Sequence, residues 1–394
     1  MLPFLLPYLE VQKLYGFARP LGEVLAFSAN VWSYGTAAEG IHLWGRVLRL
    51  YPHGEGETFL GVTAFVLAGV AIAGLIADSR REAAAVPRLH GWRRGVAIII
   101  ALVAGAQAFA FLSTVLVGGF IVKFGGLTIR ASTPVRLLIQ TMIAVAAGLA
   151  ISPRARAIAR RVLEAPVTLH AALFVLAVWL SLGPAPSAGS ERVSGMGLYA
   201  LLYDHVPGFT GVRVPARYAM IAGLFLAVLA GYGAARFARR SWAPGVLALA
   251  GVLIIADSAA MPLAMNHTWG VNEATPPARV YPAATAPQVY QRVARLPAGS
   301  AIAEFPFGDS AWEIRYVYYA AAHGKPILNG YSGAFPPAYL RRFAALRRFG
   351  TDGDAAWRAL VDAGATHVVV HVPAFANPNE PRMLSAWLED RGRA

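Results

Sequence analysis

Two arginines and one aspartate stand at the ends of apolar segments, where charged side chains can do chemistry beside a membrane. Arg213 and Arg217 flank the start of the apolar run 216–236, and Asp257 lies near the end of the run 243–262. Guanidinium pairs bind phosphate through paired hydrogen bonds, so these residues predict a site for a lipid phosphate or diphosphate. Two alternatives stay open: the arginines can act as anchors that fix helix depth, and Asp257 can form a structural ion pair with Arg213 or Arg217.

A second concentration of polar and aromatic side chains lies in residues 315–333, RYVYYAAAHGKPILNGYSG. Aromatic faces stack on pyranose rings, and amide or ammonium groups bond sugar hydroxyls. The segment can equally be an ordered loop that packs on the membrane bundle. The candidate residues for sugar or acceptor binding are Tyr316, Tyr319, His323, Lys325, Asn329 and Tyr331.

Other recognisable chemistry is missing from the sequence. His367 and His371 lie on one face of an expected strand, but no third ligand has suitable spacing, so we expect no zinc site. The chain has no Walker loop, GxGxxG, HExxH or GxSxG pattern, which removes the usual sequence support for nucleotide-driven transport and for zinc or serine hydrolysis.

The elements that must position these residues are apolar helices. The 394-residue chain is 57% hydrophobic and 14% charged, outside the usual soluble range. A bilayer core of ~30 Å needs ~20 apolar residues in helical form. The sequence therefore predicts an α-helical polytopic membrane protein of about six transmembrane helices, at 59–77, 96–118, 134–151, 167–183, 216–236 and 243–262.

Arginines are concentrated in every second loop, which predicts the orientation of the spans. The net charge of +14 is not clustered in a soluble domain, so we expect no nucleic-acid partner. Basic loops face the cytoplasm, so we expect 78–95, 152–166 and 237–242 there, in the inner (cytoplasmic) membrane. The residues involved are Arg80, Arg81, Arg88, Arg93, Arg94, Arg154, Arg156, Arg160, Arg161, Arg236, Arg239 and Arg240.

This orientation places residues 1–58 outside, as an extracytoplasmic or interfacial loop region before a bundle at 59–263. No signal peptide is recognisable there, so we expect that helices precede Met1. The alternative is that Met1 starts the protein and the first span draws 1–58 across. The region packs as an interfacial loop, or it roofs a substrate groove with an acid nearby, from Glu10, Glu23, Glu39, Glu55 and Glu57.

Residues 264–394 have lower hydropathy and predict a soluble, extracytoplasmic α/β domain. Strands are expected at 300–305 (SAIAEF) and 367–372 (HVVVHV), the second rich in β-branched residues. Helices are expected at 336–349, at 354–363 with Gly364 as a C-cap, and at 381–390. Strands and helices in this order are typical of a small α/β layer.

Several short stretches in collinear order resemble the carboxy-terminal portion of bacterial GT-C-type polytopic glycosyltransferases, particularly the YfhO-like branch. The resemblance covers nearly the whole chain. The similar stretches are Pro3–Tyr8, Gly16–Arg19, Pro207–Arg217, Leu226–Gly233, Val289–Tyr290, Glu304–Pro306 and His323–Tyr331.

The resemblance implies a membrane enzyme that moves a sugar from a polyprenyl-phosphate donor to an envelope glycan or protein acceptor on the outer face. Such enzymes use an acid in the first external loop as the base, and many bind a divalent cation in the full-length enzyme. In the family, this acid lies on a helix and loop that would precede Met1 of this chain. We therefore assign no catalytic residue and expect no cofactor in this chain. The competing hypothesis is a non-enzymatic scaffold or transporter for envelope polysaccharide. A transporter typically has charged mid-span residues and a repeat between halves.

Overall fold

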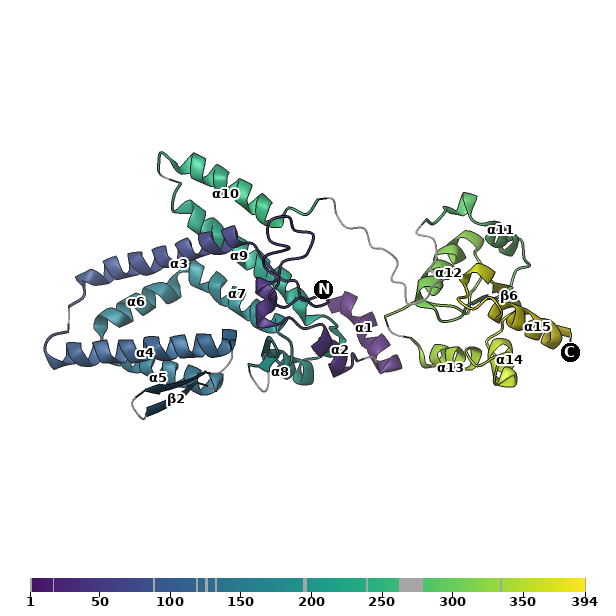
Figure 1. The fold of residues 1–394 in the computed structure, drawn as a ribbon, viewed down its shortest axis with the longest axis horizontal. Helices are drawn as coiled ribbons and strands as arrows, with labels where there is room; N and C mark the ends of the chain where they lie inside the picture. The colour runs from purple at the N-terminus through teal and green to yellow at the C-terminus, as the bar shows by residue number, and fades with distance from the viewer. Residues whose placement is uncertain are drawn as a thin grey trace. The chain divides into compact units, whose positions relative to one another are not determined.

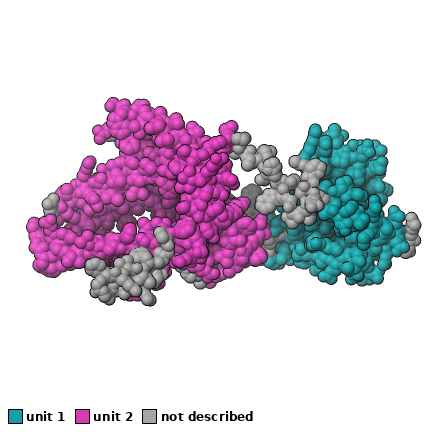
Figure 2. Space-filling model, viewed as in Figure 1, with its two compact units in different colours: residues 1–17, 265–394 teal, residues 18–264 magenta. Residues whose placement is uncertain are grey.

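The computed structural model describes residues 2–16, 18–87, 89–117, 120–124, 127–131, 133–193, 197–238, 240–261, 279–333 and 335–393. The chain forms two compact units, one of residues 18–264 and one of residues 1–17 with 265–394 (Figure 2). The boundary at 263/264 predicted from composition lies outside the described residues. Helices dominate both units (Figure 1).

Among the described residues, four helices are long and apolar enough to cross a membrane, or five if a bent pair of shorter helices counts as one span, as the sequence predicts for a multi-pass membrane protein. They are α3 (Val62–Glu82), α4 (Trp92–Val117), α5 (Pro134–Ile151) and α9 (Tyr218–Ala235). Each coincides with an expected span. For α5, Pro134 supplies the first helical residue, where its missing N–H costs nothing.

The other two expected spans are shorter helices of 16 residues, so the structure does not confirm a count of six. The run 167–183 forms α7 (Pro166–Ser181), and 243–262 forms α10 (Ala243–Ser258). Residues 152–166, expected as a loop, form the basic helix α6 (Pro153–Glu164), and the axes of α6 and α7 differ by 72°. Ser152 caps α6 by accepting the Ala155 N–H at 3.2 Å, and Pro166 starts the next helix, so the chain bends between them.

Close packing joins the spans of the larger unit. α3 and α7 both pack on α9, and α4 packs on α5 as a helical hairpin (Figure 1). A Cβ added at Gly233 in α9 would lie 1.9 Å from the Leu67 carbonyl oxygen of α3. The two backbones therefore approach as closely as they do because glycine stands at this position.

Short elements connect the spans of this unit. Antiparallel strands β1 (Phe120–Phe124) and β2 (Leu127–Ala131) join α4 to α5, with Phe120 opposite Ala131. The remaining elements are α2 (Leu21–Ala26), β3 (Ser187–Ala188), β4 (Glu191–Arg192), α8 (Leu198–His205), and the 3-10 turns η1 (Val31–Gly35), η2 (Ala83–Ala85), η3 (Phe209–Gly211) and η4 (Pro215–Arg217).

The smaller unit is built around parallel strands. β5 (Ile302–Phe305) pairs with β6 (His367–Val370), with Ile302 opposite His367, and a parallel bridge joins Ile302 to Ile327 on the other side of β5. Both strands lie where the sequence predicts them. The helices are α1 (Leu2–Tyr15), α11 (Gln288–Ala294), α12 (Ser310–His323), α13 (Pro337–Leu346), α14 (Gly353–Val361) and α15 (Glu380–Arg393), with 3-10 turns η5 (Ala283–Thr285) and η6 (Val372–Ala374).

The predicted helices of this unit are α13, α14 and α15, and Gly364 has the left-handed φ of +76° that its role after α14 requires. α11 and α12 were not predicted. The core lies between the sheet and helices α13–α15 and includes Phe305, Leu346, Leu360 and Leu384.

Candidate functional site

The chain enters α9 through a tightly held turn that carries both predicted phosphate-binding arginines. Val214 and Ala216 are buried in an apolar cluster with Ala29 and Leu182, and the Ala216 N–H donates to the Phe27 carbonyl. Arg213 and Arg217 lie on either side of these buried residues, so their side chains point outward from a fixed backbone.

Arg213 is paired with the short helix α2. Its Nε donates to a carboxylate oxygen of Glu23 at 2.7 Å, and its guanidinium carbon lies 4.8 Å from the centre of the Phe27 ring. Arg19 also approaches Glu23, at 3.5 Å. The Arg213 side chain is nevertheless 51% exposed, so it remains accessible to a ligand.

Arg217 is paired with Glu55 through both oxygens of the carboxylate, at 2.7 and 3.3 Å, and is 63% exposed. The hydrogen bond from Arg217 is the main cause that lowers the pKa of Glu55. Burial, the next largest cause, opposes it, and the charges of Arg217 and Arg213 lower the pKa further. Both guanidinium groups therefore act on the same carboxylate.

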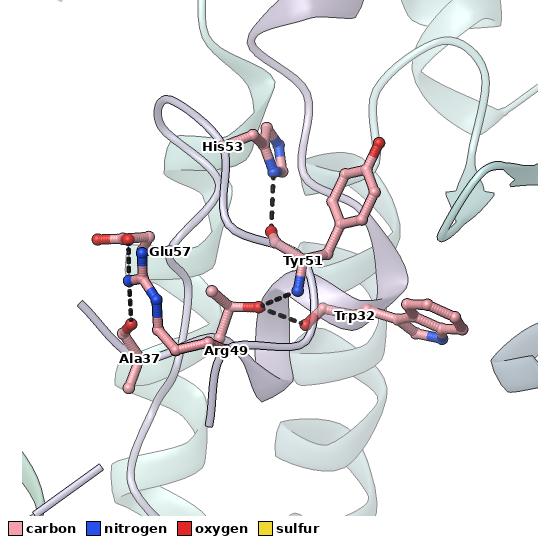
Figure 3. Close-up of polar contacts among 7 residues, drawn as sticks. Trp32, Ala37, Arg49, Tyr51, His53 and Glu57 are labelled. Carbon is pink, nitrogen blue, oxygen red and sulfur yellow. Dashed lines mark hydrogen bonds and ion pairs between the residues drawn. The ribbon is translucent and has the colours of Figure 1, made fainter. Parts of the chain in front are cut away.

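A compact loop carries Glu55, and Figure 3 shows the polar contacts made by neighbouring residues of that loop. Arg49 donates to the Ala37 carbonyl at 2.9 Å and pairs with Glu57. The Tyr51 N–H donates to the Thr36 hydroxyl at 2.9 Å, and His53 lies 3.1 Å from the Tyr51 carbonyl. These contacts fold residues 49–57 back on residues 36 and 37.

A shallow cavity of about 370 Å³ lies along this turn. Its lining residues are Val212, Arg213, Val214, Arg217, Tyr218 and Ile221. The two lining arginines, 213 and 217, pair with Glu23 and Glu55, and Arg19 also approaches Glu23, so this group of ion pairs has a net charge of +1. An anion can thus meet two exposed guanidinium groups beside an apolar wall.

Asp257 does not belong to this cavity, and the predicted ion pair with Arg213 or Arg217 is wrong. The carboxylate is buried and accepts the Trp44 indole N–H at 2.8 Å and the Thr63 backbone N–H at 2.7 Å. Thr63 lies in the first turn of α3, whose backbone N–H groups lack partners within the helix. Asp257 therefore joins the end of α10 to the start of α3, while each arginine takes a glutamate from residues 18–58.

The predicted sugar-binding residues fall into two groups. Tyr316, Tyr319, His323 and Asn329 are buried, with 6% exposure or less, so none of them presents a face to solvent. The Lys325 ammonium donates to the carbonyls of Leu296 and Pro297, at 2.7 and 3.2 Å. Tyr331 is 52% exposed. Sugar binding by this set stays a prediction, and it would need the buried side chains to become accessible.

The buried members surround a carboxylate that the sequence reading missed. Glu304 is fully buried in β5, where one oxygen accepts the Tyr290 hydroxyl at 3.0 Å and lies 2.7 Å from His371 Nε2. Burial and the nearby Glu304 raise the pKa of Tyr290. Burial lowers the pKa of His323. The spacing of Glu313, Tyr316, Tyr319 and His323 on α12 is the signal that could have revealed this inward face.

A second buried carboxylate, Glu313, ties α12 to the loops that follow β5 and Ile327. It accepts the N–H groups of Gly308 at 2.6 Å and Gly330 at 2.7 Å, and the Asn329 amide at 2.9 Å. Burial raises the pKa of Glu313, and these hydrogen bonds offset part of the effect. These contacts make Glu313 a structural anchor of the loops.

Metal ligation has little support among the residues that the structure describes: no three histidine, cysteine or acidic side chains come together there. His371 is engaged by Glu304, and His367 lies beside the Thr366 hydroxyl at 2.9 Å.

Comparison with known proteins identifies no relative: no family model, curated protein or solved structure matches this chain. Function is therefore inferred from the site itself.

Proposed function

We propose that this chain is a membrane glycosyltransferase, or the carboxy-terminal part of one, that transfers a sugar from a polyprenyl-phosphate-linked donor to an envelope acceptor on the outer face. One observation carries the proposal: two exposed guanidinium groups, Arg213 and Arg217, line one cavity at the amino end of the apolar helix α9. In this proposal the cavity binds the donor phosphate while the polyprenyl chain lies along the apolar wall.

The charge arrangement supports a phosphate ligand. Arginine presents a planar fork that suits phosphate oxygens. Arg217 already holds the Glu55 carboxylate through two nitrogens, and Arg213 holds Glu23 through Nε. A phosphate adds to, or exchanges with, Glu23 and Glu55. Tyr218 and Ile221 extend the same lining toward the span, where an isoprenoid chain finds apolar contacts.

The role of the described residues in this reaction is to bind and position the donor. The divalent cation that the family resemblance implies has no fitting group of three acidic, histidine or cysteine ligands among the described residues, so no step is derived through a metal. No catalytic base is assigned to this chain.

The test is lipid binding by the intact chain in nanodiscs, with polyprenyl phosphate as the probe. Surface ion pairs are worth up to about 1 kcal/mol each, so loss of two guanidinium contacts predicts about 30-fold weaker binding for Arg213→Ala with Arg217→Ala. Arg192→Ala is the matched control, because Arg192 is exposed and lies outside the cavity lining. Unchanged affinity in the double variant would remove the phosphate site. Binding of polyprenyl phosphate by the wild-type chain supports the donor site whether or not this chain alone transfers sugar.

A further inference from the structure

A second cavity, of about 520 Å³, lies in the smaller unit and is larger than the arginine cavity. The loop after β5 (residues 306–310) and the loop after β6 (residues 374–376) form two of its walls. Residues 343–349 at the end of α13 form another, and Glu380 at the start of α15 completes it. Its volume falls in the range of small-molecule sites.

The cavity lies where parallel sheets commonly bind ligands. The chain leaves β5 through α12 to reach Ile327 on one side of β5, and later returns to β6 on the other side. The connections therefore diverge at the carboxyl end of β5, and crevices at such points are typical ligand sites. Gly308 has a φ of +84°, and a Cβ there would lie 1.9 Å from the Phe343 ring, so the wall depends on glycine at this position.

The lining combines aromatic rings with a few polar groups. Phenylalanines at 305, 307, 343, 349 and 375 contribute to the wall, and the Arg347 guanidinium lies 5.4 Å from the centre of the Phe343 ring. Ser310 adds a hydroxyl near the start of α12. This mixture suits a ligand with both apolar faces and hydroxyl groups.

The charges around the cavity select against an anion. Asp309 and Glu380 carry two negative charges against the one positive charge of Arg347, and Asp309 also caps α12 by accepting the N–H groups of Ala311 and Trp312. A phosphate or sulfate would face two carboxylates. A neutral sugar would donate hydroxyl protons to Glu380 and accept hydrogen bonds from Arg347.

We infer that this cavity binds a neutral pyranose, with a ring face on the phenylalanine wall and hydroxyls on Arg347 and Glu380. The site lies in a different unit from the arginine cavity. It is inferred from its own lining and does not rest on the phosphate site, so either can fail while the other stands.

The experiment is saturation-transfer NMR on the full chain in nanodiscs free of polyprenyl phosphate. The probes are methyl glucoside, methyl galactoside, methyl mannoside and N-acetylglucosamine, with glucose 6-phosphate as the anionic comparison. We expect transfer from the aromatic protons to at least one neutral sugar, and weaker transfer to the phosphate. Arg347→Ala and Glu380→Gln should each weaken that affinity about tenfold, and the double variant should abolish it.

Matched controls are Arg348→Ala and Asp390→Asn, which change exposed side chains outside the lining and should leave binding unchanged. Thermal unfolding checks that every variant remains folded. Absence of transfer to all four neutral sugars would overturn the inference. So would preference for glucose 6-phosphate, or full binding by the folded double variant.

Discussion

Asn329 completes the sheet of the smaller unit with its side chain, and removing that side chain should open β5. On the side of β5 that faces Ile327, the last backbone hydrogen bond is the one that the Leu328 N–H donates to the Ile302 carbonyl, at 2.8 Å. Beyond it, the Asn329 amide oxygen accepts the Glu304 N–H at 2.7 Å and its nitrogen donates to the Glu304 carbonyl at 2.8 Å. The amide thus replaces a peptide group of a neighbouring strand.

The expected loss follows from what Asn329→Ala leaves behind. Two buried backbone groups of Glu304 would lack partners, at about 1–3 kcal/mol each. The two groups together give a central value of about 4 kcal/mol, which corresponds to about 700-fold faster exchange of the Glu304 amide through local opening. The Glu313 carboxylate also loses the amide donor at 2.9 Å, which adds to the effect.

Hydrogen exchange with mass spectrometry, read on peptides covering residues 300–307, measures this loss directly. Asn379→Ala is the control, because Asn379 is exposed and its side chain has no hydrogen-bond partner among the described residues. If Asn329→Ala left the exchange of Glu304 within threefold of the parent, the side chain would not be holding the strand.

Two further predictions concern the larger unit. Gly233→Val should lower the thermal midpoint of the detergent-solubilised protein, because even a Cβ would overlap the Leu67 carbonyl and overpacking costs about 1–3 kcal/mol. Gly231→Ala is the control and should leave the midpoint unchanged, because a Cβ at Gly231 meets open space. Glu55 has a folded-state pKa below its unfolded value. Its bond to Arg217 therefore stabilises the 49–57 loop at pH values above the unfolded pKa, and this stabilisation is lost as the pH falls through the folded-state pKa. Pepsin cleavage of this loop should rise at low pH relative to cleavage of the Glu55→Gln variant, which should show no such pH dependence.

The spans were predictable because lipid imposes a length and a composition on each helix separately. The bounds of α5 agree with the expected span, and α3, α4 and α9 lie within a few residues of theirs. Helix α6 was not predicted, because the arginines of residues 152–166 were interpreted as the mark of a cytoplasmic loop. Several of them bond to the chain itself: Arg154 to the carbonyls of Ala84 and Val86, and Arg156 to those of Leu149 and Ala150.

The partners of the charged residues could not be predicted, because they come from distant parts of the chain. Arg213 and Arg217 each had several possible acids, and the sequence does not say which loop folds over them. The loop at 49–57 brings Glu55 to Arg217, 162 positions away, through contacts made by Arg49 and Tyr51. Pairing is therefore set by the local fold of that loop.

The burial of Glu304 could not be predicted either, because its hydrogen-bond partners are also distant in the sequence. A glutamate in a short strand reads as a solvent-facing residue, yet Glu304 is buried because Tyr290 and His371 supply hydrogen bonds to it from elements 14 and 67 positions away. Burying a carboxylate without such partners would cost several kcal/mol. The cluster around Glu304 is thus stable only when α11, β5 and β6 are assembled together, and no local pattern in any one of them could have revealed it.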